Sequence, residues 1–177
     1  HRLGIRPVKE ELEDLAAKYL DPIAYHEIEE LLKKKKSDRE EMLNGIKTRI
    51  EDRLHREMPN INMAFQSRVK SIYGIYRKMY LQNKDFDEIY DVYAVRIITD
   101  TVADCYNILG IMHDMFRPIP NRFKDYISTP KPNLYQSLHT TVIGKEGIPF
   151  EIQIRTFEMH HTAEYGIAAH WKYKEGV

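Results

Sequence analysis

The chain has 177 residues, of which 42% are apolar and 31% are charged, a composition typical of a folded globular domain rather than a disordered one. Lys and Arg together number 27, as do Asp and Glu, so no overall field attracts nucleic acid or an anionic membrane, and an anion site has to be built locally. Cys105 is the only cysteine and no apolar run approaches the roughly 20 residues that span a bilayer, so we expect a cytoplasmic protein without disulfides, a cysteine-based zinc site or a membrane segment.

The first 58 residues are predicted to form helices ahead of the main domain. Pro7 stands where a helix can begin. Apolar residues then recur at helical spacing: Val8, Leu12, Leu15 and Tyr19. Asp21-Pro22 marks a break and the start of a second helix that continues to about His55. The lysines at positions 33–36 indicate a solvated helix face or a turn between helices, and contact with RNA is the less favoured alternative.

From residue 59 to residue 177 the pattern changes to strands interleaved with helices. Strands are expected at 61–70, 92–99, 138–143 and 148–154, the last two joined as a hairpin, and helices at 71–79, 102–116 and 156–171. The intervening loop is stiffened by Pro118, Pro120, Pro130 and Pro132 and is not helical. This order predicts an α+β fold in which helices flank a mixed sheet.

Three cations surround the first junction between a strand and a helix. Arg68 and Lys70 share the polar face of their strand, because side chains alternate along it. Lys78 follows in the next helix, whose N-terminus also attracts anions. This spacing fits a polyphosphate site and a surface ladder of charges equally well.

Two carboxylates each stand at the start of an apolar strand. Asp91 precedes the strand at 92–99, and Glu151 shares the polar face of the later strand with Gln153. Neighbouring carboxylates can hold Mg²⁺, which prefers oxygen ligands, and one of them can take a proton from a hydroxyl nucleophile. For isolated acids, however, salt bridges to nearby arginines are the commoner role.

The segment 122–139 combines cations, an aromatic ring and directional hydrogen-bonding groups on a backbone stiffened by proline. Arg122, Lys124 and Lys131 are candidate phosphate partners. Tyr135 offers a flat face for a base, although a tyrosine taken alone is more often a core residue. The remaining polar candidates are Asn133 and His139.

The other histidines give weaker signals. His160 and His161 are adjacent, so on a helix they point about 100° apart and cannot chelate one metal. His160 and Glu164 are one turn apart, but no further zinc ligands accompany them. A role on the helix surface or in the core is therefore favoured.

In order and spacing, these segments resemble the synthetase domain of the RelA/SpoT family. The matching strings are Arg68-Val-Lys-Ser-Ile-Tyr-Gly-Ile-Tyr-Arg-Lys78, Ile89-Tyr-Asp-Val-Tyr-Ala-Val-Arg-Ile-Ile98, Arg122-Phe-Lys-Asp-Tyr-Ile127, Pro130-Lys-Pro-Asn-Leu-Tyr-Gln-Ser-Leu-His-Thr-Thr-Val142, Glu151-Ile-Gln-Ile-Arg-Thr156 and Ala163-Glu-Tyr-Gly-Ile-Ala-Ala-His-Trp171. The resemblance covers about residues 60–176, and the segment from His1 to about Pro22 resembles the end of that family's hydrolase domain. Because the sequence begins without methionine, we expect a piece of a longer protein.

The resemblance implies two segments and a fold. Residues 1–58 would be the end of a hydrolase domain and a linker, and residues 59–177 a (p)ppGpp synthetase domain. That domain is similar to the nucleotidyltransferase fold of DNA polymerase β, a mixed sheet flanked by helices. The basic stretch at 122–125 resembles the version found in bifunctional members, which both make and hydrolyse (p)ppGpp.

The resemblance also implies a role for each candidate residue. For ATP, Arg68 and Arg96 would hold the adenine while Lys70 and Lys78 hold the phosphates. Asp91 and Glu151 would bind Mg²⁺, and Glu151, with Gln153 beside it as a further catalytic residue, would activate the acceptor 3′-hydroxyl. Tyr135 would stack on the guanine of GTP or GDP. The rest of the acceptor site would be Lys124, Lys131, Asn133 and His139.

The implied reaction moves a pyrophosphoryl group from ATP to GTP or GDP, giving (p)ppGpp and AMP, with Mg²⁺ as cofactor, in the stringent response. The expected partners are these nucleotides, with no membrane, no direct nucleic-acid binding by this part of the protein, and ribosome contact only through other regions. Two alternatives remain open: a module that binds nucleotides without turnover, and an RNA-binding domain that uses the lysines at 33–36.

Some positions raise questions of local geometry. Ser67, Gly74 and Asn121 stand where the family frequently has glycine, serine and glycine. In a regular strand Asp91 and Arg96 would face opposite sides. Both reach one site only if Asp91 lies at an irregular strand start or Arg96 curls over an edge.

Overall fold

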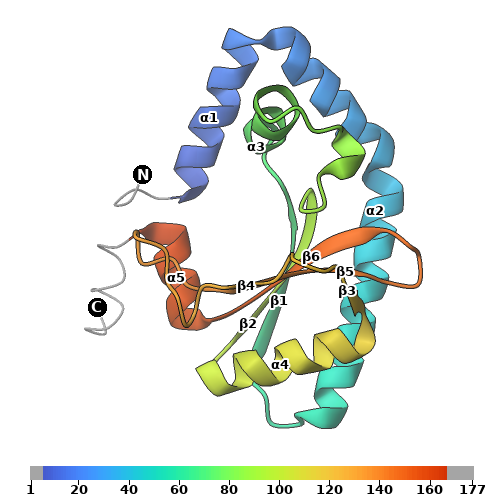
Figure 1. Cartoon of the computed structure of the whole chain (residues 1–177), viewed down its shortest axis with the longest axis vertical. Coiled ribbons are helices and arrows are strands. Elements are labelled where there is room, and N and C mark those ends of the chain that lie inside the picture. The colour runs from blue at the N-terminus through green and yellow to red at the C-terminus, as the bar shows by residue number, and fades with distance from the viewer. Residues whose placement is uncertain (1–5, 167–177) are drawn as a thin grey trace.

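The computed structural model describes residues 6–166, in which helices flank one mixed sheet (Figure 1). The strands are β1 (Met63–Val69), β2 (Tyr93–Thr99), β3 (Arg117–Pro118), β4 (Lys124–Asp125), β5 (Leu138–Ile143) and β6 (Pro149–Thr156). Their order is β1-β2-β6-β5-β3, with β4 also paired to β5. Within this described sheet β2 and β6 run parallel, and the other pairs are antiparallel. The expected α+β class and the hairpin of β5 and β6 are confirmed.

Two helices precede the sheet, as predicted. α1 (Arg6–Leu20) and α2 (Pro22–Glu57) meet at Asp21, whose side chain accepts a hydrogen bond of 3.1 Å from the backbone nitrogen of Ala24 and so caps α2. The lysines at 33–36 lie in the middle of α2 rather than in a turn. Among residues 6–166, no helix combines the length and the apolar character needed to cross a membrane.

The apolar spacing in α1 identified the helix but not the face that packs. The four residues that carry the spacing are all exposed, whereas Ala17 is buried: Val8, Leu12, Leu15 and Tyr19. In α4 (Val102–Met115), Cys105, Ile108 and Met112 are buried, while Val102 and Tyr106 at the same helical spacing are exposed. In both helices, the element that packs against the helix determines which face is buried, and the local sequence pattern does not identify that element.

The connection from β1 to β2 contains short helical turns. α3 (Ile72–Tyr76) begins at Ser71, whose hydroxyl accepts a hydrogen bond of 3.1 Å from the backbone nitrogen of Gly74, as the sequence predicts. The chain then widens into one turn of π-helix, η1 (Arg77–Leu81), before the 3₁₀ turn η2 (Phe86–Glu88). After β6, α5 spans Phe157–Tyr165, and the predicted helix end at Trp171 lies outside the described residues.

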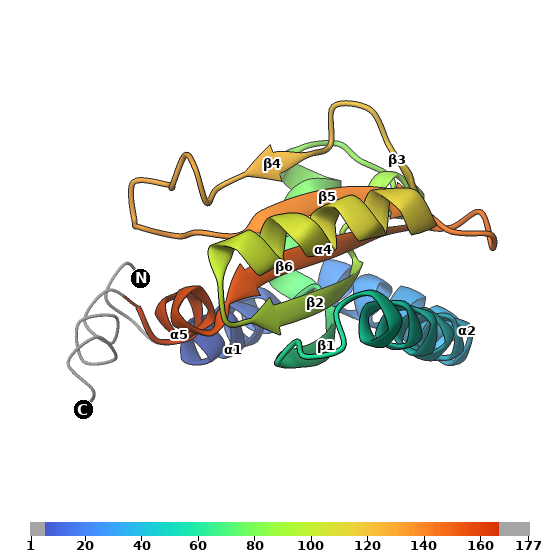
Figure 2. The ribbon, with the colours of Figure 1, turned by 90° about the horizontal axis from the view of Figure 1, so that it is seen from below.

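One face of the sheet is apolar and carries the core. It carries Val95 and Ile97 of β2 and Ile152 and Ile154 of β6, and α4 packs on it against β6 and β5 (Figure 2). The second half of α2 adds buried residues to the same core: Met42, Leu43, Ile46, Ile50 and Leu54. The division at residues 58 and 59 remains a prediction, and these residues of α2 pack with the sheet across it.

The opposite face collects polar side chains in rows. Arg96 pairs with Gln66 on one side and with Gln153 on the other, and Gln153 in turn pairs with His139 of β5. His139 pairs with Lys124 of β4, so one row crosses five strands. A second row runs through Arg68, Ala94, Glu151 and Thr141. Register alone therefore places the candidate residues of five strands on one side of the sheet.

Two matched substitutions in α2 test whether this helix belongs to the core of the sheet. Ile50 is fully buried and Ile23 is 82% exposed. We expect Ile50→Ala to lower the free energy of unfolding by about 2–5 kcal/mol. Ile23→Ala is expected to change it by no more than about 0.5 kcal/mol. Urea denaturation followed by circular dichroism measures both. A sheet transition that Ile50→Ala leaves unmoved would mean that α2 folds separately.

Candidate active site

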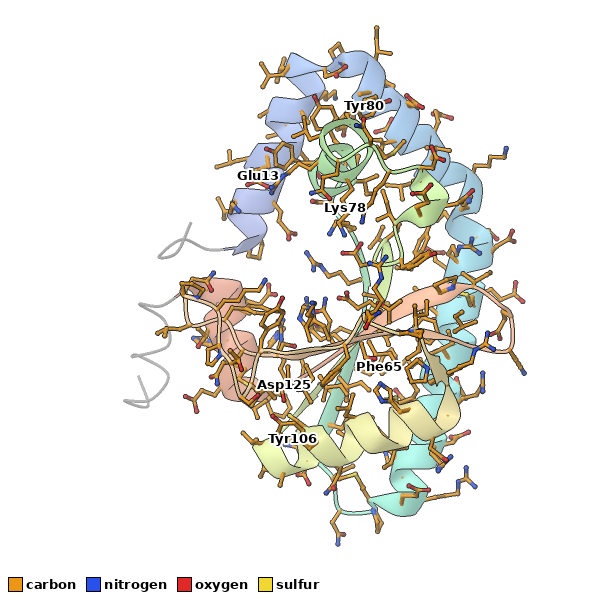
Figure 3. The ribbon with its side chains drawn as sticks, in the orientation of Figure 1. Glu13, Phe65, Lys78, Tyr80, Tyr106 and Asp125 are labelled. Carbon is orange, nitrogen blue, oxygen red and sulfur yellow. The ribbon has the colours of Figure 1, made fainter. Side chains whose placement is uncertain are left out.

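The polar face of the sheet is the floor of a cleft of about 780 Å³, with further lining from α1, from the α3–η1 segment and from the loop before β5 (Figure 3). Of the twelve residues for which the resemblance implies a role, eleven line this cleft: Arg68, Lys70, Lys78, Asp91, Lys124, Lys131, Asn133, Tyr135, His139, Glu151 and Gln153. Arg96 does not line it. The structure thus gathers the predicted donor, metal and acceptor residues into one space.

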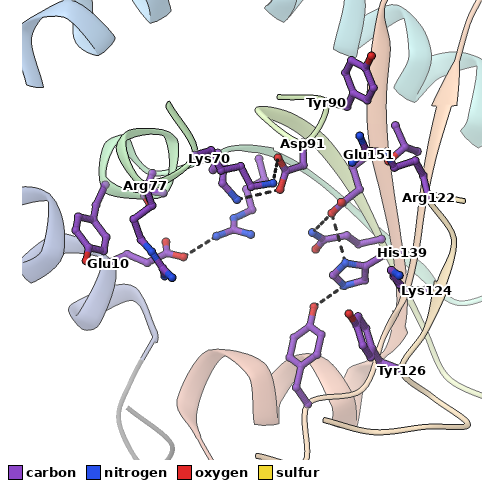
Figure 4. A pocket seen from close by; sticks show the side chains of 18 of the residues that line it. Glu10, Lys70, Arg77, Tyr90, Asp91, Arg122, Lys124, Tyr126, His139 and Glu151 are labelled. Atoms are coloured by element: carbon purple, nitrogen blue, oxygen red, sulfur yellow. Dashed lines mark hydrogen bonds and ion pairs between the residues drawn. The ribbon is translucent and has the colours of Figure 1, made fainter. Parts of the chain in front are cut away.

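Asp91 lies just outside the strand that follows it. β2 begins at Tyr93, so strand alternation does not direct the Asp91 side chain, which lines the cleft. Of the two arrangements that would let Asp91 reach the site, the structure therefore shows the first, in which Asp91 lies at an irregular strand start. Lys70 and Lys78 donate hydrogen bonds of 2.9 and 3.0 Å to its two carboxylate oxygens (Figure 4). Burial raises the pKa of Asp91, but the two ammonium groups outweigh it and hold that pKa below its ordinary range.

Glu151 has the opposite electrostatic environment. Its side chain is only 14% exposed, and burial raises its pKa above the ordinary value. Gln153 opposes this shift by donating a hydrogen bond of 2.6 Å to Glu151 Oε1, while the negative charge of Asp91 adds to it. His139 Nδ1 lies 3.6 Å from the same oxygen. The cleft therefore holds one carboxylate that is readily ionised and a second that retains its proton more strongly.

Aromatic rings and cations alternate on the other side of Glu151. The Tyr135 hydroxyl and His139 Nε2 are 2.7 Å apart, and the Tyr126 ring meets both rings edge to face. Lys131 Nζ lies 4.7 Å from the centroid of Tyr126 and 5.0 Å from that of Tyr135. Asn133 Oδ1 accepts a hydrogen bond from the backbone nitrogen of Tyr135, which orders the turn around Leu134. The candidate stacking platform is thus held in a defined position.

α1 contributes a wall that the sequence analysis did not anticipate. Glu10 Oε1 forms an ion pair of 2.6 Å with Arg68 NH2, and Lys9 and Glu13 also line the cleft. Asp14 accepts a hydrogen bond of 2.8 Å from the backbone nitrogen of Tyr73 at the start of α3. No local pattern signals these contacts, because they depend on how α1 docks against the later domain.

Further lining residues were also missed. They are polar or aromatic residues to which no role was assigned, although four of them lie inside the matching strings: Tyr73, Arg77, Lys84, Glu88, Tyr90 and Tyr126. Arg122, which was named as a phosphate partner, is present with its guanidinium 5.0 Å from the ring centroid of Tyr90. These residues add positive charge and ring surface to both halves of the cleft.

Two of the positions that raised questions of geometry have a clear outcome. Asn121 adopts a φ of 63°, the left-handed conformation that a glycine would take and that asparagine tolerates. A Cβ at Gly74 would lie 3.1 Å from both the Lys70 side chain and the Ser71 hydroxyl, so glycine leaves room for Lys70 to reach Asp91.

Arg96 is buried and His160 is half-buried beside the cleft. Arg96 is 6% exposed, and burial, helped by repulsion from Arg155 and Arg68, lowers its pKa to about 10. Burial and the nearby guanidinium of Arg155 lower the pKa of His160 to about 4. His160 Nδ1 accepts a hydrogen bond of 2.8 Å from Arg155 Nη2, so this histidine has a structural partner within the domain.

The carboxylates suit a magnesium ion better than zinc. Within residues 6–166, no group of three or more His, Cys, Asp or Glu side chains is arranged to hold a metal ion. Asp91 and Glu151 offer two hard oxygen ligands in a cleft rich in cations. Mg²⁺ is commonly held by one or two carboxylates while water and substrate phosphates complete its octahedron.

The chain is similar to several known proteins. Residues 67–177 match the family described as a region found in RelA / SpoT proteins. The chain is 56% identical over 175 residues to a probable guanosine-3′,5′-bis(diphosphate) 3′-pyrophosphohydrolase of Synechocystis, covering 99% of this chain and 23% of that protein. It is 50% identical over 175 residues to a GTP pyrophosphokinase of Streptomyces coelicolor, covering 99% of this chain and 20% of that protein.

Its fold is also similar to that of a solved enzyme. The small alarmone synthetase 2 of Bacillus subtilis superposes with a TM-score of 0.64 at 29% identity, covering 82% of this chain and 83% of that one. The nucleotidyltransferase-like fold that the sequence predicts is thereby confirmed.

Two isosteric substitutions should change stability in opposite directions. Asp91, whose pKa is lowered, stabilises the fold above pH 3.8, and this contribution is lost as the pH falls through its folded pKa. Glu151, whose pKa is raised, favours the fold below pH 4.5, and this contribution is lost as the pH rises through its folded pKa. At pH 7 we expect Asp91→Asn to cost roughly 1–3 kcal/mol, because two lysines lose their counter-charge.

Glu151→Gln is expected to leave the melting temperature at pH 7 unchanged or higher. Thermal melts of the two variants at pH 7 and at pH 4 measure these differences. A loss of stability at pH 7 in Glu151→Gln as large as that in Asp91→Asn would contradict the assigned environments.

Proposed function

We propose, from the premise that the chain belongs to the RelA/SpoT family, that it transfers a pyrophosphoryl group from ATP to the 3′-hydroxyl of GTP or GDP. The products are AMP and (p)ppGpp, the signal of the stringent response. The chain spans 20–23% of the length of the first curated relatives it matches, so the activity of the whole protein belongs to this proposal. The observation that carries it is a single cleft in which Asp91 and Glu151 lie between two groups of cations.

In the donor half we assign Arg68 to the adenine of ATP and Lys70 and Lys78 to its phosphates. The two lysines now neutralise Asp91, and a bound triphosphate offers them more negative charge at the same place. Arg68 is held by Glu10 and is 24% exposed at its side chain, so it remains accessible to a ligand in the cleft. Arg96 remains assigned to the donor half by resemblance, although it lies outside the cleft lining.

In the acceptor half we assign Tyr135 to the guanine ring. The ring is fixed by its contacts with His139 and Tyr126, and a fixed platform loses little entropy when a base stacks on it. The residues assigned to the ribose and phosphates of GTP or GDP are Lys124, Lys131, Asn133 and His139.

Glu151 is assigned as the general base. A carboxylate whose pKa is raised by burial is a better proton acceptor near neutral pH than an exposed one. It takes the proton of the acceptor 3′-hydroxyl as that oxygen forms a bond to the β-phosphorus of ATP. The bond between the β-phosphorus and the oxygen bridging it to the α-phosphorus breaks, and AMP leaves with that oxygen. Gln153 orients the carboxylate through its hydrogen bond.

The cations of the cleft stabilise the charge of the transferred group. Phosphoryl-type transfer requires alignment and charge neutralisation more than covalent participation of the protein. Asp91 and Glu151 would hold Mg²⁺, which when bound neutralises phosphate oxygens. Lys70 and Lys78 lie next to Asp91 and would contact the same phosphates from the protein side.

We further propose that the parent protein both makes and hydrolyses (p)ppGpp. Support comes from the basic stretch at 122–125 and from the relatives, of which one is named a pyrophosphohydrolase and another a pyrophosphokinase. The hydrolase activity is assigned to a region beyond this chain. We place the protein in the cytoplasm, where ATP and GTP are plentiful, and assign no nucleic-acid contact to this part of it.

Removal of either acidic charge tests catalysis. We expect Asp91→Asn and Glu151→Gln each to lower AMP formation from labelled ATP and GTP by at least about 10²–10³-fold, because each removes a charge required in the transition state. Asp87→Asn is a matched control, since Asp87 is exposed and pairs with Lys35 outside the cleft. Near-normal AMP release by either cleft variant would reject the assignment. Nucleotide binding without turnover by the unsubstituted chain would favour the binding-module alternative.

Substitution of the stacking platform tests the acceptor half. We expect Tyr135→Leu to weaken GDP binding by about 5–150-fold, the effect of losing roughly 1–3 kcal/mol of stacking. Tyr135→Phe retains the ring and should retain most of the affinity. Binding of a non-hydrolysable ATP analogue should change little in both. Calorimetric titrations with each nucleotide separate the two halves, and an equal loss for both nucleotides would argue against this role.

A further inference from the structure

Two arginines are buried side by side on the polar face of the sheet, beside the cleft. Arg96 of β2 is 6% exposed and Arg155 of β6 is 1% exposed. Arg96 is paired with Gln153 and Ile98 with Arg155, so the two arginines are diagonal neighbours on one face of two parallel strands. Burial, and then repulsion from Arg155, lowers the pKa of Arg96. Two buried cations this close require a nearby negative group.

Glu164 of α5 supplies that negative group. Its Oε1 lies 3.5 Å from Arg96 NH1 and 3.6 Å from Arg155 NH2, and its side chain is 22% exposed. His160, one turn earlier on the same helix, accepts from Arg155 and is neutral, so it adds no negative charge. Glu164 lies in the Ala163-Glu-Tyr-Gly stretch, for which neither the sequence nor the proposed reaction supplies a role.

Both arginines lead back to Glu151. Arg96 Nε donates a hydrogen bond of 3.1 Å to Gln153 Oε1. Because that oxygen is occupied, the Gln153 amide nitrogen faces Glu151, to which it donates at 2.6 Å. On the other side Arg155 NH1 lies 3.4 Å from the Tyr135 hydroxyl, which contacts His139, and His139 faces Glu151. Figure 4 shows the cleft end of both paths converging on Glu151.

We propose that Glu164 is a positioning residue for the reaction. By holding Arg96 and Arg155 in place, it keeps the amide nitrogen of Gln153 directed toward Glu151. It also keeps the Tyr135–His139 pair directed toward Glu151. Glu164 does not line the cleft, so it acts through the arginines rather than on a substrate. Without its charge, Arg96 is free to leave Gln153, and the amide can then turn its oxygen toward the carboxylate. The inference rests on the proposed function only in treating Glu151 as the base.

Steady-state kinetics of Glu164→Gln tests the proposal. We expect kcat to fall by about 10–100-fold, the usual effect of losing a group that orients a catalytic residue. KM for ATP and for GTP should change by less than kcat, because the phosphate-binding Lys70 and Lys78 are held by Asp91 and not by Glu164. Glu158→Gln, on the first turn of the same helix, is the control and should match the unsubstituted chain. A kcat within twofold of that of the unsubstituted chain, or a rise in KM at constant kcat, would overturn the proposal.

A double-mutant cycle tests the path. If Glu164 acts through Gln153, the loss of kcat in the double variant Glu164→Gln, Gln153→Ala is smaller than the product of the two single losses. Multiplicative losses would reject this path. Should Glu164→Gln fail to fold, Glu164→Asp decides: it retains the charge but withdraws the carboxylate, and it is expected to melt near the unsubstituted chain with a reduced kcat. A kcat of Glu164→Asp equal to that of the unsubstituted chain would also overturn the proposal.

Side-chain NMR separates this inference from the proposed function. The Arg96 Nε–H and Gln153 amide signals should shift in Glu164→Gln and stay in place in Glu158→Gln. If the unsubstituted chain makes no AMP and these signals shift, the proposed function fails while the linkage from Glu164 to Gln153 holds. If the chain is active and the signals stay, the positioning role fails while the proposed function stands.

Discussion

The parallel pairing of β2 with β6 is the constraint on which the rest of the site depends. It places Ala94 beside Glu151 and Arg96 beside Gln153, and it leaves the alternate residues Ile97 and Ile154 for the core. A slip of β6 by one residue would exchange its two faces, burying Glu151 under α4 and exposing Ile152 and Ile154 in the cleft. The hydrophobic packing that stabilises the sheet therefore also fixes which side chains form the site. Fold stability and site geometry share one register.

Electrostatic opposition between the two acids gives the cleft its chemical character. Asp91 sits between two ammonium groups and is held ionised, whereas Glu151 lies in a drier place where its proton is harder to remove. Different environments for two like groups are the usual way in which a site divides the roles of charge carrier and proton acceptor. The chain is neutral overall, so this character arises from local placement alone. It agrees with a reaction that draws two polyanions together.

The sequence predicted what depends on local pattern and period. Strand alternation placed Glu151 and Gln153 on one face of their strand, and the cap at Ser71 and the restart at Asp21 were readable from single residues. What it could not predict depends on docking between distant segments. Nothing near Glu10 signals that it meets Arg68, 58 positions later. The burial of Arg96 follows from α5 closing over the strands, and the apolar stripe of α1 suggested a packed face where the structure has an exposed one.

The position of Lys78 depends on how many residues the π-turn η1 contains. Such turns hold one residue more than an α-helical turn and are frequent at functional sites. Lys78 lies inside this turn and reaches Asp91 from it. A shortening by one residue between Ser71 and Leu81 would let the segment relax into ordinary helix and rotate Lys78 off its partner. Insertions and deletions in this segment should therefore be rare among functional descendants.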